Sequence, residues 1–433
     1  MRRRVLSRAI LAVAVVVLIS GTALFERPRR DDAGSYSDGV ALDAEGRVQL
    51  LAANSDPQLL IGSRVLDPGA DADPTTIDAA LELAQQQRDW LASGWLPQGE
   101  YRELVSTALL DLHVLSTGGG TLAAMNQNWR YVWPRDASFA AVAFAATGHL
   151  DDAVEVLGFL QRVQAPDGSF EARYLPDGSG PPDGRLPQTD GTGWALWALD
   201  SVVSAAPAAQ QRALLAELDP LLQRSTDYLL GLVDNGRSLP PPSPDYWEHR
   251  ERLLTLGTAA PVLAGLEAAS RIHDRAGRPE RSAALANTAA EVRASVELFF
   301  GSHSYGRYAG PSHADAASAF VLPPYQPTPL DGALQAWSGS ATSMLRPAGG
   351  IAPGAGWREL NLSWTPETAL YALAAASNGD HEQARHWLDW LAAHRTPIAA
   401  LPEKVNADGA PSGPAPLAWT CALVVLTVAE LEQ

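Results

Sequence analysis

From Thr75 to the end of the sequence, one helical segment follows another with no strand-rich block between them. Apolar residues recur at three- and four-residue spacing, and many segments have a wide face rich in Ala and Leu, as helices packed on other helices must. The segments are 75–92, 100–115, 136–147, 151–163, 192–205, 210–232, 258–274, 279–300, 332–345, 366–378, 381–394 and 417–431. Twelve helices without an exact repeat predict an all-α fold, six helical hairpins closed into an (α/α)6 barrel. An open helical solenoid is the alternative, but it would show a clearer sequence period.

The connections between these helices alternate in length. Long loops rich in Gly and Pro span 165–191, 234–257, 303–331 and 395–416. Because they recur after every second helix, they would gather at one end of a barrel. Long ordered loops in a compact domain are usually functional, so we expect the chemistry at that end.

The N-terminal part predicts export. Four arginines, at positions 2, 3, 4 and 8, precede the uncharged apolar run 9–25, which is the layout of a signal peptide or membrane anchor over residues 1–30. The run has the minimum length for a membrane span, and the arginines favour its N-terminal end inside. We expect an uncleaved anchor with the body facing outward, or a secreted protein if the segment is cleaved. Residues 31–74 then form a short extension with a β-hairpin at 39–52, and residues 75–433 form the barrel.

Charge and cysteine content limit the classes of partner and cofactor that the chain can bind. The formal net charge is -17 although the first 30 residues hold seven arginines and one glutamate, so the body is more acidic still. Such a body repels phosphate backbones, which argues against nucleic acid and restricts membrane contact to the N-terminal segment; neutral sugars fit better. Cys421 is the single cysteine, and no H-E-x-x-H or phosphate-binding motif occurs, so no metal or cofactor is expected. The oligomeric state stays open.

Four short segments at loop–helix junctions combine carboxylates with aromatic or amide side chains. They are 128–136, 188–194, 244–248 and 401–405, the last followed by 417–420. Sugars suit this mixture, because their hydroxyls bind charged hydrogen-bond partners and their C–H faces pack on rings. An oligo- or polysaccharide is therefore the expected substrate.

These segments, in this order on twelve helices, resemble the glucoamylase family, glycoside hydrolase family 15. The matching motifs are Trp133-Pro134-Arg135-Asp136, Gln188-Thr189-Asp190-Gly191, Trp247-Glu248, Leu401-Pro402-Glu403-Lys404 and Leu417-Ala418-Trp419-Thr420. The resemblance implies that Glu248 is the general acid and Glu403 the general base. It also implies that Arg135 and Asp136 bind the hydroxyls of the terminal glucose, with Trp133, Trp247, Gln188, Asp190 and Trp419 beside them.

Two features depart from the family. Residues 26–74 are too few for the large β-sandwich that usually precedes the barrel in bacterial relatives. The family's late Arg-Tyr pair would fall near Ala352, where no arginine stands, and Arg358 is the nearest candidate for that substrate contact.

The chemistry of glycoside cleavage is compatible with these assignments. It needs one carboxyl kept protonated and one kept ionised. Trp247 beside Glu248 would favour the neutral form by burial, and Lys404 beside Glu403 would favour the ionised form.

Each carboxylate also has a structural interpretation. Glu248 could be a solvated loop acid, Asp136 could cap its helix while Arg135 forms a local ion pair, and Asp190 could be a turn residue. Two further glutamates are interpreted as structural, Glu359 as a loop acid and Glu367 as a first-turn helix acid.

The sequence thus predicts an inverting exo-hydrolase that releases glucose from the non-reducing ends of α-glucans. Hydrolysis of trehalose or of α-1,6-linked glucan on the same scaffold is the alternative within the enzyme class. A catalytically silent carbohydrate-binding barrel is the alternative outside it.

Overall fold

The computed structural model describes residues 36–116 and 118–432, so the predicted export segment lies outside the described residues. The helices are α2 (Pro74–Ser93), α3 (Arg102–Leu115), α4 (Pro134–Ala146), α5 (Leu150–Val163), α6 (Asp190–Ala205), α7 (Ala208–Glu217), α8 (Asp219–Leu232), α9 (Leu256–Arg275), α10 (Pro279–Phe299), α11 (Ala333–Met344), α12 (Thr365–Ser377), α13 (His381–Ala393) and α14 (Ala418–Leu431). The 3-10 turns are η1 (Asp234–Gly236), η2 (Gly301–His303) and η3 (Ala316–Val321). The strands are β1 (Ser37–Leu42), β2 (Val48–Ala52), β3 (Leu362–Trp364), β4 (Lys404–Asn406) and β5 (Pro411–Ser412).

Six elements form a closed inner ring. In order around the ring they are α4, α6, α9, η3, α12 and α14, and α14 packs against α4 to close it. The five α-helices of the ring are buried on nearly every side, which explains their runs of Ala with few charges. At one crossing the backbones touch: a Cβ on Gly193 of α6 would lie 2.1 Å from the carbonyl oxygen of Pro261 in α9. Only glycine fits there, so the spacing of these two helices depends on it.

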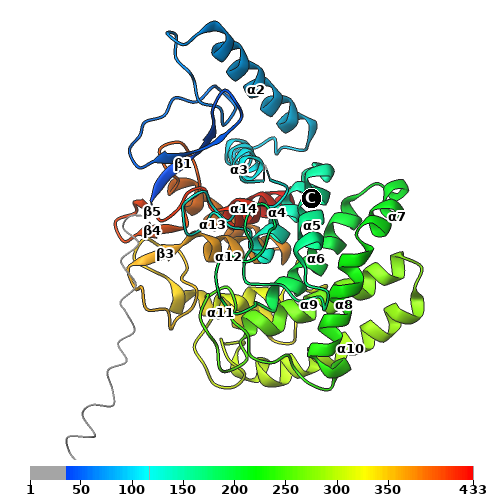
Figure 1. Ribbon diagram of the computed structural model, residues 1–433. Coiled ribbons are helices and arrows are strands. Elements are labelled where there is room, and N and C mark those ends of the chain that lie inside the picture. Colours follow the sequence, from blue (N-terminus) through cyan, green and yellow to red (C-terminus); the bar gives the residue numbers. More distant parts are fainter. Residues whose placement is uncertain (1–35, 117, 433) are drawn as a thin grey trace, which may run out of the picture. The chain divides into compact units, whose positions relative to one another are not determined.

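An outer layer of α3, α5, α8, α10, α11 and α13 covers the ring (Figure 1). Each outer helix buries one face; in α5, for example, Val156, Leu157, Phe159 and Leu160 are buried while the acidic first turn is not. Pairing each outer helix with the next inner element gives six hairpins. The predicted (α/α)6 barrel is therefore confirmed, and no open solenoid forms.

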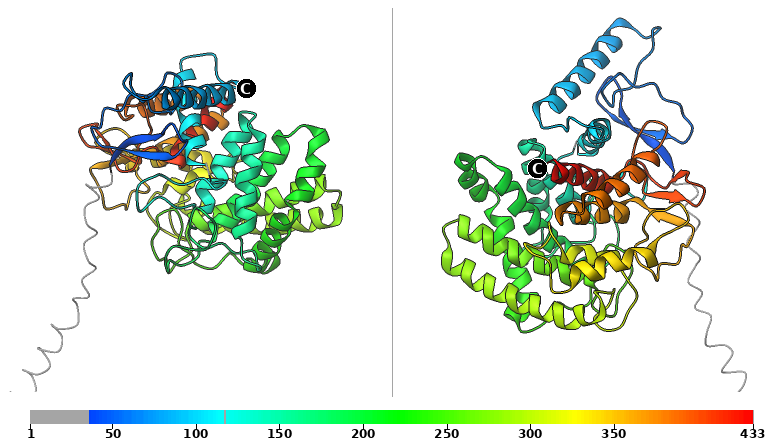
Figure 2. Two further views of the ribbon diagram at one scale, coloured as in Figure 1. Left: turned by 45° about the horizontal axis from the view of Figure 1, so that its top comes forward. Right: turned by 180° about the vertical axis from the view of Figure 1, so that it is seen from behind.

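All twelve predicted helices are present, but they are not the twelve elements of the barrel. Helix α2 lies outside the ring, and Figure 1 and the right-hand view in Figure 2 show it at the edge of the barrel, with one end next to α3. The missing inner position is taken by η3, a short turn within the predicted loop 303–331. The segment 210–232 is divided into α7 and α8 at Leu218, with Pro220 in the first turn of α8, where its missing N–H costs no helical hydrogen bond.

The inner helices all begin at the end of the ring where the long loops lie. The starts of α4, α6, α9, η3, α12 and α14 each follow a long connection, as the alternation of loop lengths predicts. Pro134 and Pro366 stand in the first turn of α4 and α12, so the chain turns sharply from loop into helix there. This end therefore combines loop side chains with the electropositive N-termini of several helices.

The N-terminal extension forms the predicted hairpin, β1 against β2, with its turn at Asp43–Arg47. It is tied to the loop that carries Glu403. Thr396 Oγ1 donates to the carbonyl of Asp38, Ser37 Oγ donates to the carbonyl of Ala415, and Arg64 donates to the carbonyl of Ile398 at 2.9 Å. The hairpin thus holds both ends of the 396–415 loop.

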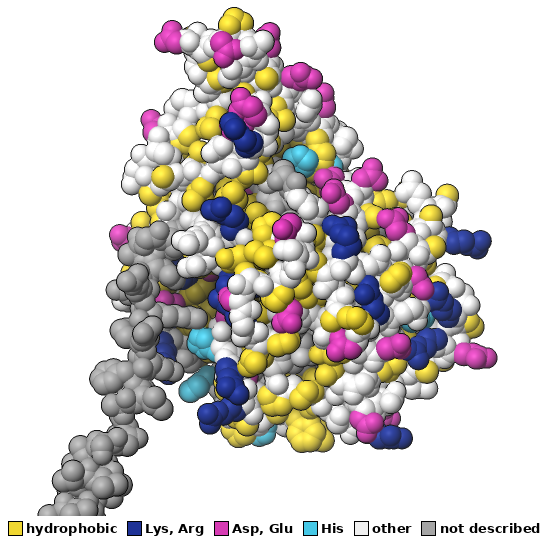
Figure 3. Space-filling model, viewed as in Figure 1, with side chains coloured by type: hydrophobic (Ala, Val, Ile, Leu, Met, Phe, Trp, Pro, Cys, Tyr) yellow, Lys and Arg dark blue, Asp and Glu magenta, His cyan; other side chains and the backbone are white. Residues whose placement is uncertain are grey.

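None of the helices in the described part of the chain is both long and apolar enough to cross a membrane. On the face drawn in Figure 3, acidic and basic side chains are interspersed rather than separated by sign.

Candidate active site

A small cavity of about 90 Å³ lies at the loop end of the barrel. Its walls come from the first turns of α4, α12 and α14 and from the loops beside them. The lining residues are Ala123, Trp129, Trp133, Arg135, Asp136, Tyr246, Glu248, Trp364, Pro366, Glu367, Glu403, Leu417 and Trp419. Six of the residues singled out from the sequence, including both proposed catalytic glutamates, are therefore brought to one place.

Glu403 is fixed by backbone pairing. It directly precedes β4, which pairs with β3, so that Lys404 lies opposite Trp364. The carbonyl of Glu403 accepts from Thr365 N, the first residue of α12, at 3.0 Å. Its side chain is nearly buried, and Oε1 accepts from Trp129 Nε1 at 3.1 Å. The ammonium of Lys404 lies 3.4 Å from Oε2, so a cation stands beside this carboxylate as the sequence predicts.

Glu248 occupies a strained backbone position. Its φ is 58°, in the left-handed region that a non-glycine residue rarely adopts, and its N–H donates to the carbonyl of Asp245 at 2.8 Å. Such residues cluster at functional sites, where surrounding contacts maintain the strain. Here Arg307 donates to the Asp245 carboxylate at 3.1 Å and so holds the start of this turn.

The surroundings of Glu248 differ from the prediction. Trp247 does not bury the Glu248 carboxylate. The centre of its indole ring lies 3.6 Å from Cζ of Arg307, and the ring packs against Trp357. The Glu248 carboxylate instead faces Arg185, Gln188 and Arg135. It is a bound, partly buried group and not a solvated loop acid.

Arg135 lies among three acids and one amide. Its guanidinium is 3.3 Å from Asp190 Oδ2, 3.4 Å from Asp136 Oδ2, 3.5 Å from Glu248 Oε1 and 3.4 Å from Gln188 Oε1. It also lies over the ring of Trp419, 5.0 Å from the centroid. A buried guanidinium with several long contacts is well placed to form shorter bonds with a ligand oxygen.

The side chains of Asp136 and Asp190 contact Arg135, and neither residue acts as the helix cap or turn residue that the structural interpretation proposed. Helix α4 begins at Pro134 with Trp133 at the cap position, so the capping interpretation of Asp136 is wrong. Asp190 is the first residue of α6, and its side chain turns inward to Arg135. Burial raises the pKa of Asp136 to about 6 and that of Asp190 to about 7, against the lowering effect of the nearby guanidinium.

Glu367 is the residue that the sequence interpretation undervalued. It is a first-turn acid of α12 as predicted, but it is fully buried, lines the cavity and has no hydrogen-bond partner for Oε2 among the described residues. Burial raises its pKa to about 8, and the charge of Glu403 adds to this. A protonated Glu367 can donate a hydrogen bond into the cavity.

A signal for Glu367 was present in the sequence. Trp364-Thr365-Pro366-Glu367 starts a helix with the same order of tryptophan, proline and acid as Trp133-Pro134-Arg135-Asp136. By contrast, Arg358 is exposed and does not line the cavity, so the structure does not bring it to this site. Glu359 accepts from Trp357 Nε1 at 3.1 Å and is a loop acid, as predicted.

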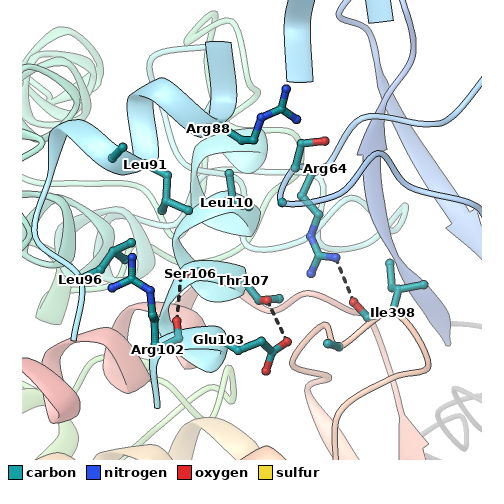
Figure 4. A pocket seen from close by; sticks show the side chains of 14 residues that line it. Arg64, Arg88, Leu91, Leu96, Arg102, Glu103, Ser106, Thr107, Leu110 and Ile398 are labelled. Atoms are coloured by element: carbon teal, nitrogen blue, oxygen red, sulfur yellow. Dashed lines mark hydrogen bonds between the residues drawn. The ribbon is translucent and has the colours of Figure 1, made fainter. Parts of the chain in front are cut away.

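A second, larger cavity of about 510 Å³ lies elsewhere, between α2, α3 and the turns at 62–64 and 398–399 (Figure 4). Its wall includes Arg64, Arg88 and Arg102 together with Leu91 and Leu110. None of the predicted site residues lines it. We place the candidate active site in the smaller cavity because the paired carboxylates converge there.

The smaller cavity also resembles a sugar site in its chemistry. It combines several carboxyl groups, a guanidinium and several indoles. In the described part of the chain no group of His, Cys, Asp and Glu side chains is arranged to hold a metal ion.

Comparison with solved structures places this arrangement in a known fold. A glycosidase of known structure is 24% identical, with a TM-score of 0.64 over 76% of this chain and 96% of that one. A bacterial glucoamylase in complex with acarbose is 16% identical, with a TM-score of 0.64 over 83% of this chain and 61% of that one. The glucoamylase from Saccharomycopsis fibuligera is 15% identical, with a TM-score of 0.57 over 88% of this chain and 98% of that one.

The chain has the glucoamylase fold. The fold that the sequence resemblance implies is thereby confirmed. Among curated proteins, an uncharacterized glycosyl hydrolase of Methanocaldococcus jannaschii is 33% identical over 100 residues, which is 22% of this chain. The match covers only 16% of that relative's length. No protein-family model matches the chain.

Proposed function

We propose that this protein is a glycoside hydrolase of the inverting, exo-acting type, which releases glucose from the non-reducing ends of α-glucans. Glu248 is the general acid and Glu403 the general base. The observation that supports this most is the convergence of both glutamates on one cavity that also contains Arg135, Asp136 and Trp419. The structural likeness to glucoamylases and to a glycosidase points the same way.

The surroundings of Glu403 suit a base. Lys404, held over the ring of Trp364 at 4.4 Å, favours the ionised form of the neighbouring carboxylate. An ionised Glu403 can take a proton from a water molecule that attacks the anomeric carbon. Glu248 would donate its proton to the glycosidic oxygen from the opposite side of the sugar.

Arg135 and Asp136 would bind the terminal glucose. The guanidinium donates to sugar hydroxyls, and Asp136 accepts from them, which together recognise the non-reducing end. A cavity closed by the first turns of inner helices favours cleavage at a chain end over cleavage within a chain. Glycoside hydrolysis by this scheme needs no metal ion or redox group.

The stereochemistry of the product tests the assignment of Glu403. An inverting enzyme keeps its carboxyls roughly 6.5–9.5 Å apart to admit water, whereas a retaining enzyme needs about 5–5.5 Å for direct attack. An α-linked substrate should therefore yield β-glucose first, with the α-anomer appearing only as mutarotation proceeds. Early proton NMR of the product measures this. Initial α-glucose would mean that Glu403 does not activate water.

A substrate panel tests the linkage. Glucose release from maltose, isomaltose, trehalose, starch and dextran distinguishes α-1,4 from α-1,6 hydrolysis and from trehalose hydrolysis. If the purified protein binds maltotriose but releases no glucose from it or from any panel member, the silent-barrel alternative holds instead.

For the location of the enzyme, we propose that the barrel lies outside the cytoplasmic membrane. The support is the sequence alone: arginines at positions 2, 3, 4 and 8 precede the apolar run 9–25. Protease added to intact cells should digest the barrel. Protection that ends only on lysis would contradict export.

A further inference from the structure

The hydrogen bonds of Glu248 are unsuited to a proton donor. Its Oε2 accepts from Arg185 at 2.7 Å, and its Oε1 accepts from Gln188 Nε2 at 2.8 Å and from Arg135 at 3.5 Å. All three partners are donors. A protonated carboxyl donates its own hydrogen, and none of these three contacts offers an acceptor, so one of the donors must move before Glu248 can hydrogen-bond to a glycosidic oxygen through this face.

The three donors differ in how firmly they are held. Arg135 and Gln188 are buried, with 6% and 4% of their surface exposed, and they also contact each other. The side chain of Arg185 is 39% exposed and comes from the stretch 183–187 of the long loop before α6, in which every residue is exposed. Arg185 is therefore the partner that can leave, and Oε2 is the oxygen that it frees.

Arg185 has a second anion within reach. Its Nε lies 3.4 Å from Asp183 Oδ2. Asp183 is itself paired with Arg173, which donates to the carbonyl of Asn128 at 2.7 Å and lies over the ring of Trp133, 5.0 Å from the centroid. Because Trp133 lines the cavity, this chain of contacts links Arg185 to the cavity wall independently of Glu248.

We propose that Arg185 is a specificity-determining residue that binds the leaving-group sugar, and that this exchange of partners frees Glu248 to act as the acid. The inference rests on the proposed function. In the bound state the glycosidic oxygen must take the place beside Oε2 that Arg185 occupies here. The guanidinium then lies next to the sugar on the leaving side, where its planar fork matches two neighbouring hydroxyls.

Once Arg185 has moved, every bond and proton of the hydrolysis can be accounted for. Glu248 Oε2 gives its proton to the glycosidic oxygen as the bond from that oxygen to the anomeric carbon breaks. Water adds to the anomeric carbon, and Glu403 takes the proton that the water loses. Arg185 stays protonated throughout and stabilises the departing sugar by hydrogen bonds alone. The favoured substrates are therefore glucosides whose leaving group carries hydroxyls, meaning oligosaccharides rather than simple alkyl or aryl glucosides.

The size of the cavity supports a rearrangement on binding. At about 90 Å³ it is well below the roughly 300–1,000 Å³ typical of ligand sites. This small volume favours a widening of the site on binding. The exposed 183–187 stretch does not line the cavity itself, but it contacts Glu248 through Arg185 and is little held by burial.

The test compares Arg185→Ala and Arg185→Lys with the unchanged full-length enzyme on two substrates, maltose and α-glucosyl fluoride. Maltose leaves a sugar and the fluoride does not. We expect Arg185→Ala to lower kcat/KM for maltose by about 10- to 100-fold, the effect of losing hydrogen bonds from a charged donor. For α-glucosyl fluoride, kcat/KM should change by less than about twofold. For maltose, kcat/KM of Arg185→Lys should lie between the values of Arg185→Ala and of the unchanged enzyme. Arg237→Ala, at an exposed site outside the cavity, is the matched control and should match the unchanged enzyme on both.

Three outcomes would overturn the inference. Unchanged or faster maltose cleavage by Arg185→Ala would mean that Arg185 covers Glu248 without binding substrate. Equal losses on both substrates would make its role structural. If the unchanged enzyme cleaves neither substrate, the proposed function fails, and the inference with it.

Discussion

Asp136 and Glu367 stand at equivalent positions of two inner helices, each three residues after the tryptophan that precedes its helix. Both are buried, and both line the candidate active site. Burial raises the pKa of Asp136, which lies 3.4 Å from Arg135, to about 6, and it raises the pKa of Glu367, which has no ion pair within the described part of the chain, to about 8. At neutral pH Asp136 is mainly an acceptor, whereas Glu367 is mainly a donor. A pair of this kind can contact both the donor and the acceptor of a sugar hydroxyl.

The raised pKa of Glu367 predicts a pH-dependent stability. Below the ordinary value of 4.5 the carboxyl is protonated in both the folded and the unfolded chain. Between 4.5 and about 8 only the folded chain keeps the proton, so this group makes the free energy of unfolding fall as pH rises. Glu367→Gln removes this loss. The Tm of the variant minus that of the unchanged protein should therefore increase from pH 4.5 to pH 8 and then level off.

Glu359→Gln is the matched control for Glu367, because it makes the same change at an exposed loop residue. Its Tm difference should stay nearly constant over the same range. If the Glu367→Gln difference is equally flat, Glu367 is not held protonated by burial.

Glu248→Gln keeps the shape of the side chain but cannot deliver a proton. General acid catalysis contributes typically 10²–10⁴-fold, so turnover of maltose should fall by at least that order. α-Glucosyl fluoride should lose far less, because fluoride departs with little protonation. Steady-state kinetics on both substrates measure the difference.

Glu403→Gln provides the comparison for this experiment. Loss of the base slows attack by water whatever the leaving group is, so both substrates should suffer similarly. Equal losses in Glu248→Gln as well would remove Glu248 from the acid role.

Arg135→Ala should lose both binding and turnover. One hydrogen bond from a charged donor is worth about 1.5–3 kcal/mol, which corresponds to a fall in kcat/KM of about 10- to 150-fold. Arg135→Lys keeps the positive charge among Asp136, Asp190 and Glu248 and so controls for folding. A lower Tm with unchanged kinetics of the folded fraction would make Arg135 a structural residue.

Arg64 links the N-terminal extension to the barrel through a buried ion pair. It lies 2.6 Å from Asp111 in α3, and both side chains are almost fully buried. Arg64→Met leaves an unpaired buried carboxylate and should cost about 3–5 kcal/mol of unfolding free energy, measured by urea denaturation. Asp111→Leu in the same chain should restore most of this loss.

The control for Arg64 is Arg88→Met, at the wall of the same cavity. Arg88 donates to Gln85 and to the carbonyl of Ile61 and pairs with no carboxylate of the described residues, so its removal should cost under about 1 kcal/mol. Similar losses in both variants would show that the cavity wall, and not the ion pair, stabilises the protein.

Much of the fold could be predicted from the sequence because helical periodicity is a local signal. All twelve predicted segments are helices, and the ends differ by only a few residues. The position of α2 outside the ring and the role of η3 inside it could not be predicted. Both depend on tertiary packing: Ala316–Val321 is too short to show a helical period, yet it is buried on all sides.

The candidate site divides in the same way. The order of the motifs predicted that Arg135, Glu248 and Glu403 share one site, and all three line the cavity. Each stands at a loop–helix junction at the same end of the ring. Arg185 could not be predicted, because its contact with Glu248 spans 63 residues of sequence and starts from an exposed loop. The catalytic roles themselves remain predictions.

The closure of the ring by α14 against α4 has a consequence for biosynthesis. A ribosome makes α4 nearly three hundred residues before α14, and Trp419 and Glu403 belong to the last part to emerge. Until then the first inner helix has no partner on one side, and the cavity lacks the proposed base and one of its walls. Under the proposed mechanism, a nascent chain that carries Glu248 and Arg135 in full is therefore still inactive, and an exported barrel of this design would acquire its activity only after nearly the whole chain had been delivered to the place where it folds.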